Sequence, residues 1–229
     1  MTATSKKVLF VLTSHDRKGT KPSGFFLSEA THPYRILVDG GYSVDFVSPK
    51  GEAHVDPDSL DLDDGVNAAF WNDPALRDAV EHTKRPSDVR AVDYAGIFFA
   101  GGHAAMWDLP NDSDIAALTA NVYEHGGIVA AVCHGPAALV NVKCSNGEYL
   151  IKGMFLAAFT NDEERAVGLD RVVPFMLEDR IRERGGHHDP APNWQIKVCV
   201  SGRLVTGQNP ASATRVGDAM LTMLNNAAH

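Results

Sequence analysis

Short apolar runs alternate along the chain with longer stretches in which apolar residues recur every three or four positions. The short runs predict strands buried on both faces, and the longer stretches predict amphipathic helices. This alternation is typical of an α/β fold in which a doubly wound, mostly parallel sheet lies between layers of helices. We expect strands at VLFVLT from Val8, SVDFVS from Ser43, AGIFFA from Ala95, IVAAV from Ile128 and FLAAFT from Phe155, and helices beginning near Leu27, Asp73, Asp112, Pro136, Asp162, Pro174 and Pro210.

Near the C-terminus the pattern changes. The segments WQIKVCV and RLVTG flank Ser201-Gly202, which predicts a small β-hairpin. The polar stretch from Gly51 to Asp64 predicts a long surface loop. Because neither an internal repeat nor a linker-like change of composition interrupts the sequence, we expect residues 1–229 to form a single α/β domain.

One predicted strand runs directly into a cysteine and then into a helix, in the segment IVAAVCHGPAAL. Pro136 suits the first turn of that helix, so Cys133 lies at a corner between the two elements. Such a corner strains the backbone and tolerates only small residues two positions away, which here are Ala131 and Gly135. A helix N-terminus there would lower the thiol pKa from about 8.5. The segment therefore predicts a nucleophile, whereas an isolated cysteine is more often a small buried core residue.

Other polar groups follow the predicted strands. In doubly wound sheets the reactive groups gather where parallel strands end. Glu29 follows the first strand across a loop, and Gly101 and Gly102 follow AGIFFA. Amides of such glycines, with that of His134, would form an oxyanion hole. The alternatives are a solvated helix residue for Glu29 and a simple turn for the glycines. The sequence GGHAAM does not match G-x-G-x-x-G, which excludes a dinucleotide site.

Composition narrows the class of partner. With 21 basic and 29 acidic residues the net charge is −8, so we expect no nucleic-acid partner, which would need a basic face. Three cysteines without a C-x-x-C pair argue against a disulfide framework and a zinc ribbon. The apolar run Val8 to Leu12 is too short for a signal peptide or a membrane span, so we expect a cytoplasmic protein without membrane contact. His187 and His188, with Asp189, could be considered as metal ligands. Adjacent histidines usually point in different directions, however, and no further ligand is evident, so we expect no metal site.

Several separate motifs together resemble the ThiJ/PfpI superfamily, the class I glutamine amidotransferase-like proteins. The resemblance extends from the strand at Val8 to the helix at Leu224, and within the superfamily the chain is most similar to the branch of glutathione-independent glyoxalases and heat-shock chaperones. It implies a flavodoxin-like arrangement of the sheet. The motifs are GFFLSEATHPY, GGHAAMWDLP, AVCHGPAAL, FTNDEE and GRLVTGQNPASA.

The resemblance also implies roles for particular residues. It places the Glu29 carboxyl group within hydrogen-bond reach of the Cys133 sulfur, and it makes His134 the catalytic histidine. It assigns Glu164 as the acidic partner of that histidine, with Asp162 as the alternative. Glu163 and Glu164 could equally be a solvated helix start, where acidic residues are favoured.

The same resemblance predicts the lining of the pocket. His103, Met106 and Trp107 are expected to face the substrate. Ala104 stands where the family usually has glycine, and its methyl group would narrow the site. Cys144 and Cys199 are expected to be structural.

The activity that the resemblance implies is that of glyoxalase III, a lyase of the D-lactate dehydratase type. The Cys133 thiolate would attack a small 2-oxoaldehyde such as methylglyoxal, and proton transfer through an enediol would give lactate without a cofactor. The resemblance also implies a homodimer. Three other functions stay open from sequence: a stress-related holding chaperone, a sensor of cysteine oxidation, and a cysteine amidase or peptidase.

Overall fold

The structure is a computed structural model, and it describes residues 6–227. Its centre is a six-stranded sheet in the order β4-β1-β5-β6-β10-β9. Neighbouring strands are parallel throughout except for β9, which pairs antiparallel with β10. The predicted α/β class and mostly parallel sheet are confirmed. The strands are β1 (Lys7–Val11), β4 (Ser43–Val47), β5 (Gly96–Phe99), β6 (Ile128–Val132), β9 (Val198–Ser201) and β10 (Leu204–Gly207).

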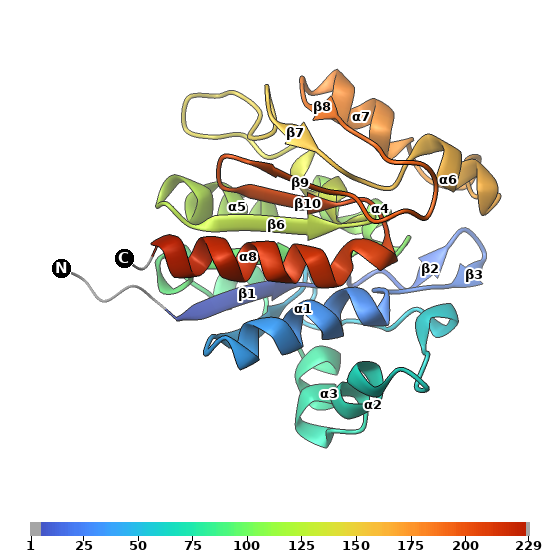
Figure 1. Ribbon diagram of the computed structural model, residues 1–229, viewed down its shortest axis with the longest axis vertical. Helices are drawn as coiled ribbons and strands as arrows, with labels where there is room; N and C mark the ends of the chain where they lie inside the picture. The colour runs from blue at the N-terminus through green and yellow to red at the C-terminus, as the bar shows by residue number, and fades with distance from the viewer. Residues whose placement is uncertain (1–5, 228–229) are drawn as a thin grey trace.

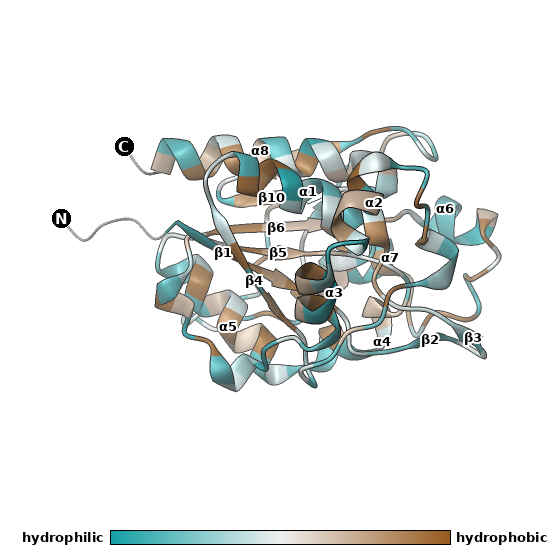
Figure 2. Ribbon diagram, turned by 90° about the horizontal axis from the view of Figure 1, so that it is seen from below, coloured by the Kyte–Doolittle hydropathy of each residue, from teal (hydrophilic) through white to brown (hydrophobic). Residues whose placement is uncertain are grey.

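Helices cover both faces of this sheet (Figures 1 and 2). Helices α1 (Leu27–Asp39) and α8 (Ala213–Ala227) pack together on one face, and α5 (Ser113–Glu124) lies on the other. An apolar core lies on each face of the sheet, and successive residues of a strand point alternately into one core and the other. In β1, Leu9 and Val11 belong to one core, and Val8 and Phe10 belong to the other. The remaining helices are α2 (Gly65–Trp71), α3 (Pro74–Glu81), α4 (Ala105–Asp108), α6 (Asn161–Ala166) and α7 (Leu177–Glu183).

Aspartate residues cap the N-termini of several of these helices, at the positions where the sequence predicts that helices begin. Asp73 accepts hydrogen bonds from the first amides of α3, and Asp112 does the same for α5. Both predicted starts are confirmed. Within residues 6–227 no helix is long and apolar enough to cross a membrane.

Two predicted elements differ from the structure. The segment from Phe155 forms only the short strand β7 (Phe155–Leu156), which pairs with β8 (His187–His188) outside the main sheet. The reason is that its next amides bond elsewhere: that of Ala157 donates to the Thr206 hydroxyl, and that of Phe159 to the Cys133 carbonyl. The expected helix at Pro136 is a 3₁₀ helix, η5 (Gly135–Leu139).

Two other segments pack more closely against the rest of the domain than their sequences predict. The C-terminal hairpin is part of the main sheet, because β10 pairs with β6 along its whole length. The polar stretch from Gly51 to Asp64 contains the short 3₁₀ helix η1 (Pro57–Ser59) and buries Asp56 to 2% exposure. A further hairpin, β2 (Arg17–Lys18) with β3 (Lys21–Pro22), lies near α6 beyond the carboxyl ends of the strands (Figure 1).

The tight corner after β6 predicts that adding a methyl group at Gly135 destabilises the fold. A Cβ atom at Gly135 would lie 2.4 Å from the Phe99 carbonyl oxygen, a backbone atom that cannot move aside. We expect Gly135→Ala to lower the free energy of unfolding by about 1–3 kcal/mol in chemical denaturation. Gly65→Ala is the control, because a Cβ there has nothing within 4 Å and should be neutral or stabilising. Equal stability of the two variants would contradict the packing argument.

Candidate active site

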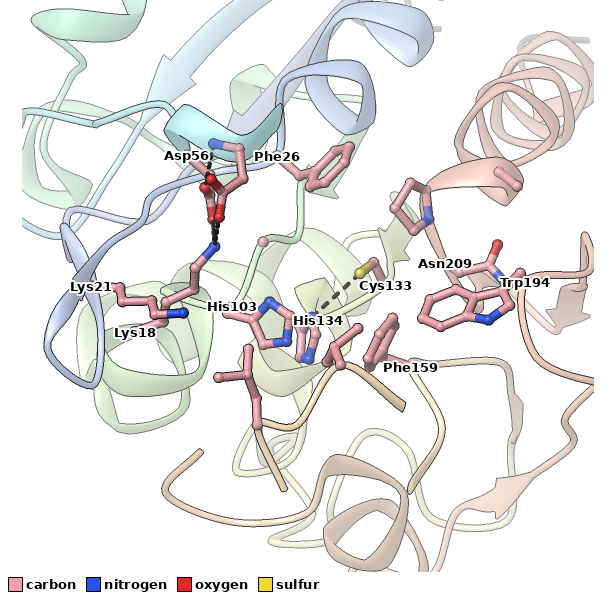
Figure 3. A pocket seen from close by; sticks show the side chains of 16 residues that line it. Lys18, Lys21, Phe26, Asp56, His103, Cys133, His134, Phe159, Trp194 and Asn209 are labelled. Carbon is pink, nitrogen blue, oxygen red and sulfur yellow. Dashed lines mark hydrogen bonds and ion pairs between the residues drawn. The ribbon is translucent and has the colours of Figure 1, made fainter. Parts of the chain in front are cut away.

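A pocket of about 460 Å³ opens where the parallel strands end. Cys133 lies at its centre, with His103 and His134 beside it (Figure 3). This is the position expected for the site of a doubly wound sheet. The other lining residues are Lys18, Lys21, Phe26, Asp56, Asp58, Gly102, Phe159, Val167, Leu169, Trp194, Asn209, Pro210 and Ala211.

Cys133 is held in a strained backbone conformation at the end of β6. Its φ is 59°, a left-handed value that residues other than glycine seldom adopt. The strain is maintained on both sides, because the Cys133 amide donates to the Gly207 carbonyl at 2.9 Å and its carbonyl accepts from the Phe159 amide at 3.0 Å. The predicted corner and the predicted need for a small residue at Gly135 are both confirmed.

A chain of hydrogen bonds leads away from the sulfur. The Cys133 Sγ atom lies 3.3 Å from His134 Nδ1, and His134 Nε2 lies 2.8 Å from Glu164 Oε2. A carboxylate can only accept, so the ring N–H at Nε2 donates to Glu164 and Nδ1 is left to receive the thiol proton. Asp162, the alternative partner, is exposed and pairs with Arg165. The acid in contact with His134 is therefore Glu164.

Helix α6 brings Glu164 to this position. The Thr160 hydroxyl accepts from the Glu163 amide, and the Glu163 carboxylate accepts from the Thr160 amide, which together form a capping box. Burial alone would raise the pKa of Glu164, but hydrogen bonds from His103 and His134 lower it to about 2. The acid is thus ionised when the site is ready to react.

His103 shares that carboxylate. Its Nε2 atom lies 2.9 Å from Glu164 Oε1, and its ring centroid is 4.1 Å from that of His134. Burial and the neighbouring His134 lower the pKa of His103 to about 4, so it is neutral at pH 7. These three residues place ligand atoms within 4.8 Å of one another and form a group that could hold a metal ion. Both Glu164 oxygens already accept imidazole N–H groups, so a metal would have to displace two hydrogen bonds.

The Glu29 carboxyl group is fully buried in the first turn of α1. Its Oε2 atom accepts the Gly101 amide at 2.9 Å, while Oε1 has no partner with good hydrogen-bond geometry. Burial raises the pKa of Glu29 to about 8, although its interactions with the Cys133 thiol and the Gly101 amide oppose that rise. Glu29 is consequently protonated at neutral pH and lies beside the sulfur.

The Cys133 thiol has a raised pKa, contrary to the expectation from sequence. Burial raises it well above its usual range, and the adjacent Glu29 raises it further. The expected helix dipole is weak here because η5 is a five-residue 3₁₀ helix. The resting site therefore holds a protonated thiol that lies between His134 Nδ1 and the Glu29 carboxyl group.

The two glycines after β5 have different partners. We expected both amides to face a substrate oxygen, but the Gly101 amide is occupied by Glu29. A Cβ at Gly101 would lie 2.5 Å from Glu29 Oε2 and 2.7 Å from the His134 amide nitrogen, so only glycine fits. The Gly102 amide instead hydrogen-bonds Cys133. Because the Gly102 amide already points at the reacting sulfur, it and the His134 amide are the donors expected for an oxyanion on the carbon that bonds to that sulfur.

The aromatic lining was misassigned from sequence. Trp107, which we expected in the pocket, packs on the edge of an apolar core and stacks on His15 at 5.6 Å, and Met106 lies within that core. Ala104 is fully buried and does not line the pocket. The aromatic residues that line it are Phe26, Phe159 and Trp194.

Sequence offers little signal for those three aromatic residues. Phe26 and Phe159 adjoin the motifs GFFLSEATHPY and FTNDEE, and their proximity to Glu29 and Glu164 is the one available clue. Trp194 begins the segment WQIKVCV, which the pattern assigns to a strand of the hairpin, but β9 begins only at Val198, so Trp194 lies in the connection before it.

Known proteins share both the sequence and this architecture. Residues 21–223 match the DJ-1/PfpI family. The chain is 34% identical to "Glutathione-independent glyoxalase HSP31" of Saccharomyces cerevisiae, covering 96% of this chain and 99% of that protein. It is similar to the crystal structure of glyoxalase III from Candida albicans, with a TM-score of 0.86 at 30% identity over 94% and 96% of the two chains. It is also similar to Rapid Encystment Protein 24 KDa of Francisella tularensis, with a TM-score of 0.92 at 40% identity over 95% and 98%.

The raised pKa of Glu29 predicts a pH-dependent cost in stability. The unfolded chain loses this proton near pH 4.5 but the folded protein keeps it until about pH 8, so the wild type loses stability as pH rises between these values. A glutamine side chain at this position has no proton to lose. We expect Glu29→Gln to match the wild type near pH 4 and to be more stable by on the order of 4–5 kcal/mol at pH 9. Denaturant unfolding across this range measures it, and a constant difference would contradict the buried proton.

Proposed function

The chain belongs to the DJ-1/PfpI family, and from that premise we propose that it is a glutathione-independent glyoxalase, converting methylglyoxal or a similar 2-oxoaldehyde to the 2-hydroxy acid. Relatives similar over nearly their full length bear this activity in their names. One observation carries the proposal: two groups able to hold a proton, His134 and Glu29, both adjoin the Cys133 sulfur. The reaction needs a nucleophile and a way to move a proton between adjacent carbons.

In the first step the sulfur attacks the aldehyde carbon, C1. Cys133 gives its proton to His134 Nδ1, whose other nitrogen remains bonded to Glu164. The S–C1 bond forms as the C1–O π bond opens, and protonated Glu29 gives its proton to that oxygen. The product is a hemithioacetal. The amides of Gly102 and His134 stabilise the charge that develops on the oxygen.

The second step moves hydrogen from C1 to C2. Glu29, now a carboxylate, removes the C1 proton while protonated His134 gives its proton to the C2 oxygen, forming an enediol. Glu29 then delivers its proton to C2 as the C1 hydroxyl proton passes back to His134, which leaves a thioester. C1 loses a C–H bond and C2 gains one, so C1 is oxidised as C2 is reduced and the chemistry needs no redox cofactor.

Hydrolysis completes the cycle. A water molecule adds its hydroxyl group to the acyl carbon and gives its remaining proton to Glu29. The C–S bond breaks, and His134 returns its proton to the sulfur of Cys133. The 2-hydroxy acid leaves, and all three groups regain their resting protonation.

We also propose the location expected from composition and the assembly implied by the resemblance. Three free cysteines, one of them the proposed nucleophile, suit a reducing compartment such as the cytoplasm. The homodimer stays a prediction, which light scattering of the purified protein tests.

The most direct activity test is lactate production. Purified protein should convert methylglyoxal to lactate without glutathione, and EDTA should not slow it, because side chains perform every proton transfer proposed above. Cys133→Ala should make none. Loss of methylglyoxal without lactate would indicate simple trapping by thiols and would contradict the proposal. A chaperone function would be favoured if the wild type makes no lactate while Cys133→Ala still suppresses aggregation of a heated client protein.

The mechanism also predicts different defects for the two proton carriers. Glu29→Gln should lower kcat by about 10²- to 10⁴-fold with a smaller change in KM, because the glutamine amide can still donate a hydrogen bond to the C1 oxygen in the first step but cannot remove the C1 proton in the second. His134→Ala keeps the backbone amide and should instead block formation of the hemithioacetal. Mass spectrometry of intact protein should therefore detect a methylglyoxal adduct on Glu29→Gln but not on His134→Ala. Near wild-type turnover of Glu29→Gln would remove Glu29 from the chemistry.

A further inference from the structure

The pocket is much larger than methylglyoxal. That molecule has five non-hydrogen atoms and occupies the space of about three water molecules, or roughly 90 Å³ at about 30 Å³ each. The pocket measures about 460 Å³, a size typical of sites for larger ligands. A substrate of this minimal size would leave most of the pocket to water.

The two sides of the pocket differ in character (Figure 3). On one side Lys18 donates to both Asp56 and Asp58, at 2.8 and 2.9 Å. Lys21 lies beside them, so two lysines and two aspartates balance in charge on this side, which therefore offers little net attraction to an anionic group. The other side, here called the aromatic arm, is formed by Phe159 and Trp194, with Val167 and Leu169 among the remaining apolar lining residues.

Trp194 is built into the aromatic arm. Its φ is 66°, a conformation that bulky residues rarely adopt, and such strain concentrates at functional sites. Its amide donates at 2.8 Å to Oε1 of the fully buried Glu163, which also accepts the side-chain amides of Gln208 and Asn209. A buried charge with several donors fixes this strained turn in place.

The indole ring of Trp194 remains uncovered even so. It meets Phe159 edge to face, with centroids 5.8 Å apart, yet Trp194 is 48% exposed. The Phe159 ring in turn lies tilted against the imidazole of His134, with the two ring centroids 4.4 Å apart. Aromatic contacts therefore run from the proposed base through the buried ring of Phe159 to the exposed Trp194 at the rim of the pocket.

We infer that the aromatic arm is a subsite for an apolar, preferably aromatic, substituent on the 2-oxoaldehyde, and that Trp194 determines this specificity. The inference rests on the proposed function. A substrate held with its aldehyde carbon at Cys133 would lay its substituent past the edge of Phe159 onto Trp194, covering the exposed surface of the indole ring and displacing water. Phenylglyoxal, whose product is mandelate, belongs to this substrate class.

The test compares kcat/KM for phenylglyoxal and methylglyoxal in matched variants. Trp194→Ala should lower the value for phenylglyoxal by about 10- to 100-fold, mainly through KM, and change that for methylglyoxal by less than about threefold. Trp194→Phe should restore most of the preference. Ile196→Ala is the control, because Ile196 lies in the same segment and is 56% exposed but does not line the pocket. Equal losses for both substrates in Trp194→Ala, or an unchanged ratio, would overturn the inference.

A binding measurement separates this inference from the proposed function. If the wild type turns over neither aldehyde, the proposed glyoxalase function fails, and calorimetry with the two product acids then decides on the subsite. Mandelate binding at least about tenfold more tightly than lactate, with the difference lost in Trp194→Ala, would support the aromatic arm. Equal binding of the two acids would refute it.

Discussion

The buried contact between the Glu29 carboxyl group and the Cys133 thiol is the constraint on which the site depends. Two groups that would each be ionised more readily in water are held without charge, because burial penalises both anions and the adjacent Glu29 disfavours the thiolate further. The site therefore stores two protons next to the reacting sulfur. The proposed isomerisation needs one group that first donates a proton and then removes one, and a protonated Glu29 can do both. A nucleophile that is permanently ionised would have no use for such stored protons.

The rest of the local structure maintains this contact against its cost. The left-handed turn at Cys133 aims the sulfur into the pocket, and Gly101 supplies both the amide that holds Glu29 and the space that a side chain would fill. His134 provides the outlet for the thiol proton because Glu164 fixes its ring from the far side. Strained backbone and buried polar groups cost stability, and they lie together where the chemistry requires them.

Sequence reasoning succeeded where a local rule decides the structure. Periodicity located the main strands, and the small residues around Cys133 identified the turn, because sterics at that corner depend on neighbouring residues alone. It failed where distant residues decide. The thiol pKa depends on burial by the whole fold, and the position of Trp194 depends on its bond to Glu163, 31 residues earlier. Trp107 was misplaced because its direction is set by packing on His15 rather than by its motif.

The central claim is that Glu29 carries a proton at neutral pH, and its titration tests this directly. Carbon-13 NMR of protein labelled at the glutamate carboxyl carbons, with Glu29→Gln identifying the signal, would follow it from pH 4 to pH 10. We predict a midpoint near pH 8. We also predict that Cys133→Ala keeps a raised midpoint, because burial rather than the thiol is the main cause. A midpoint near 4.5, the ordinary value for glutamate, would contradict the account.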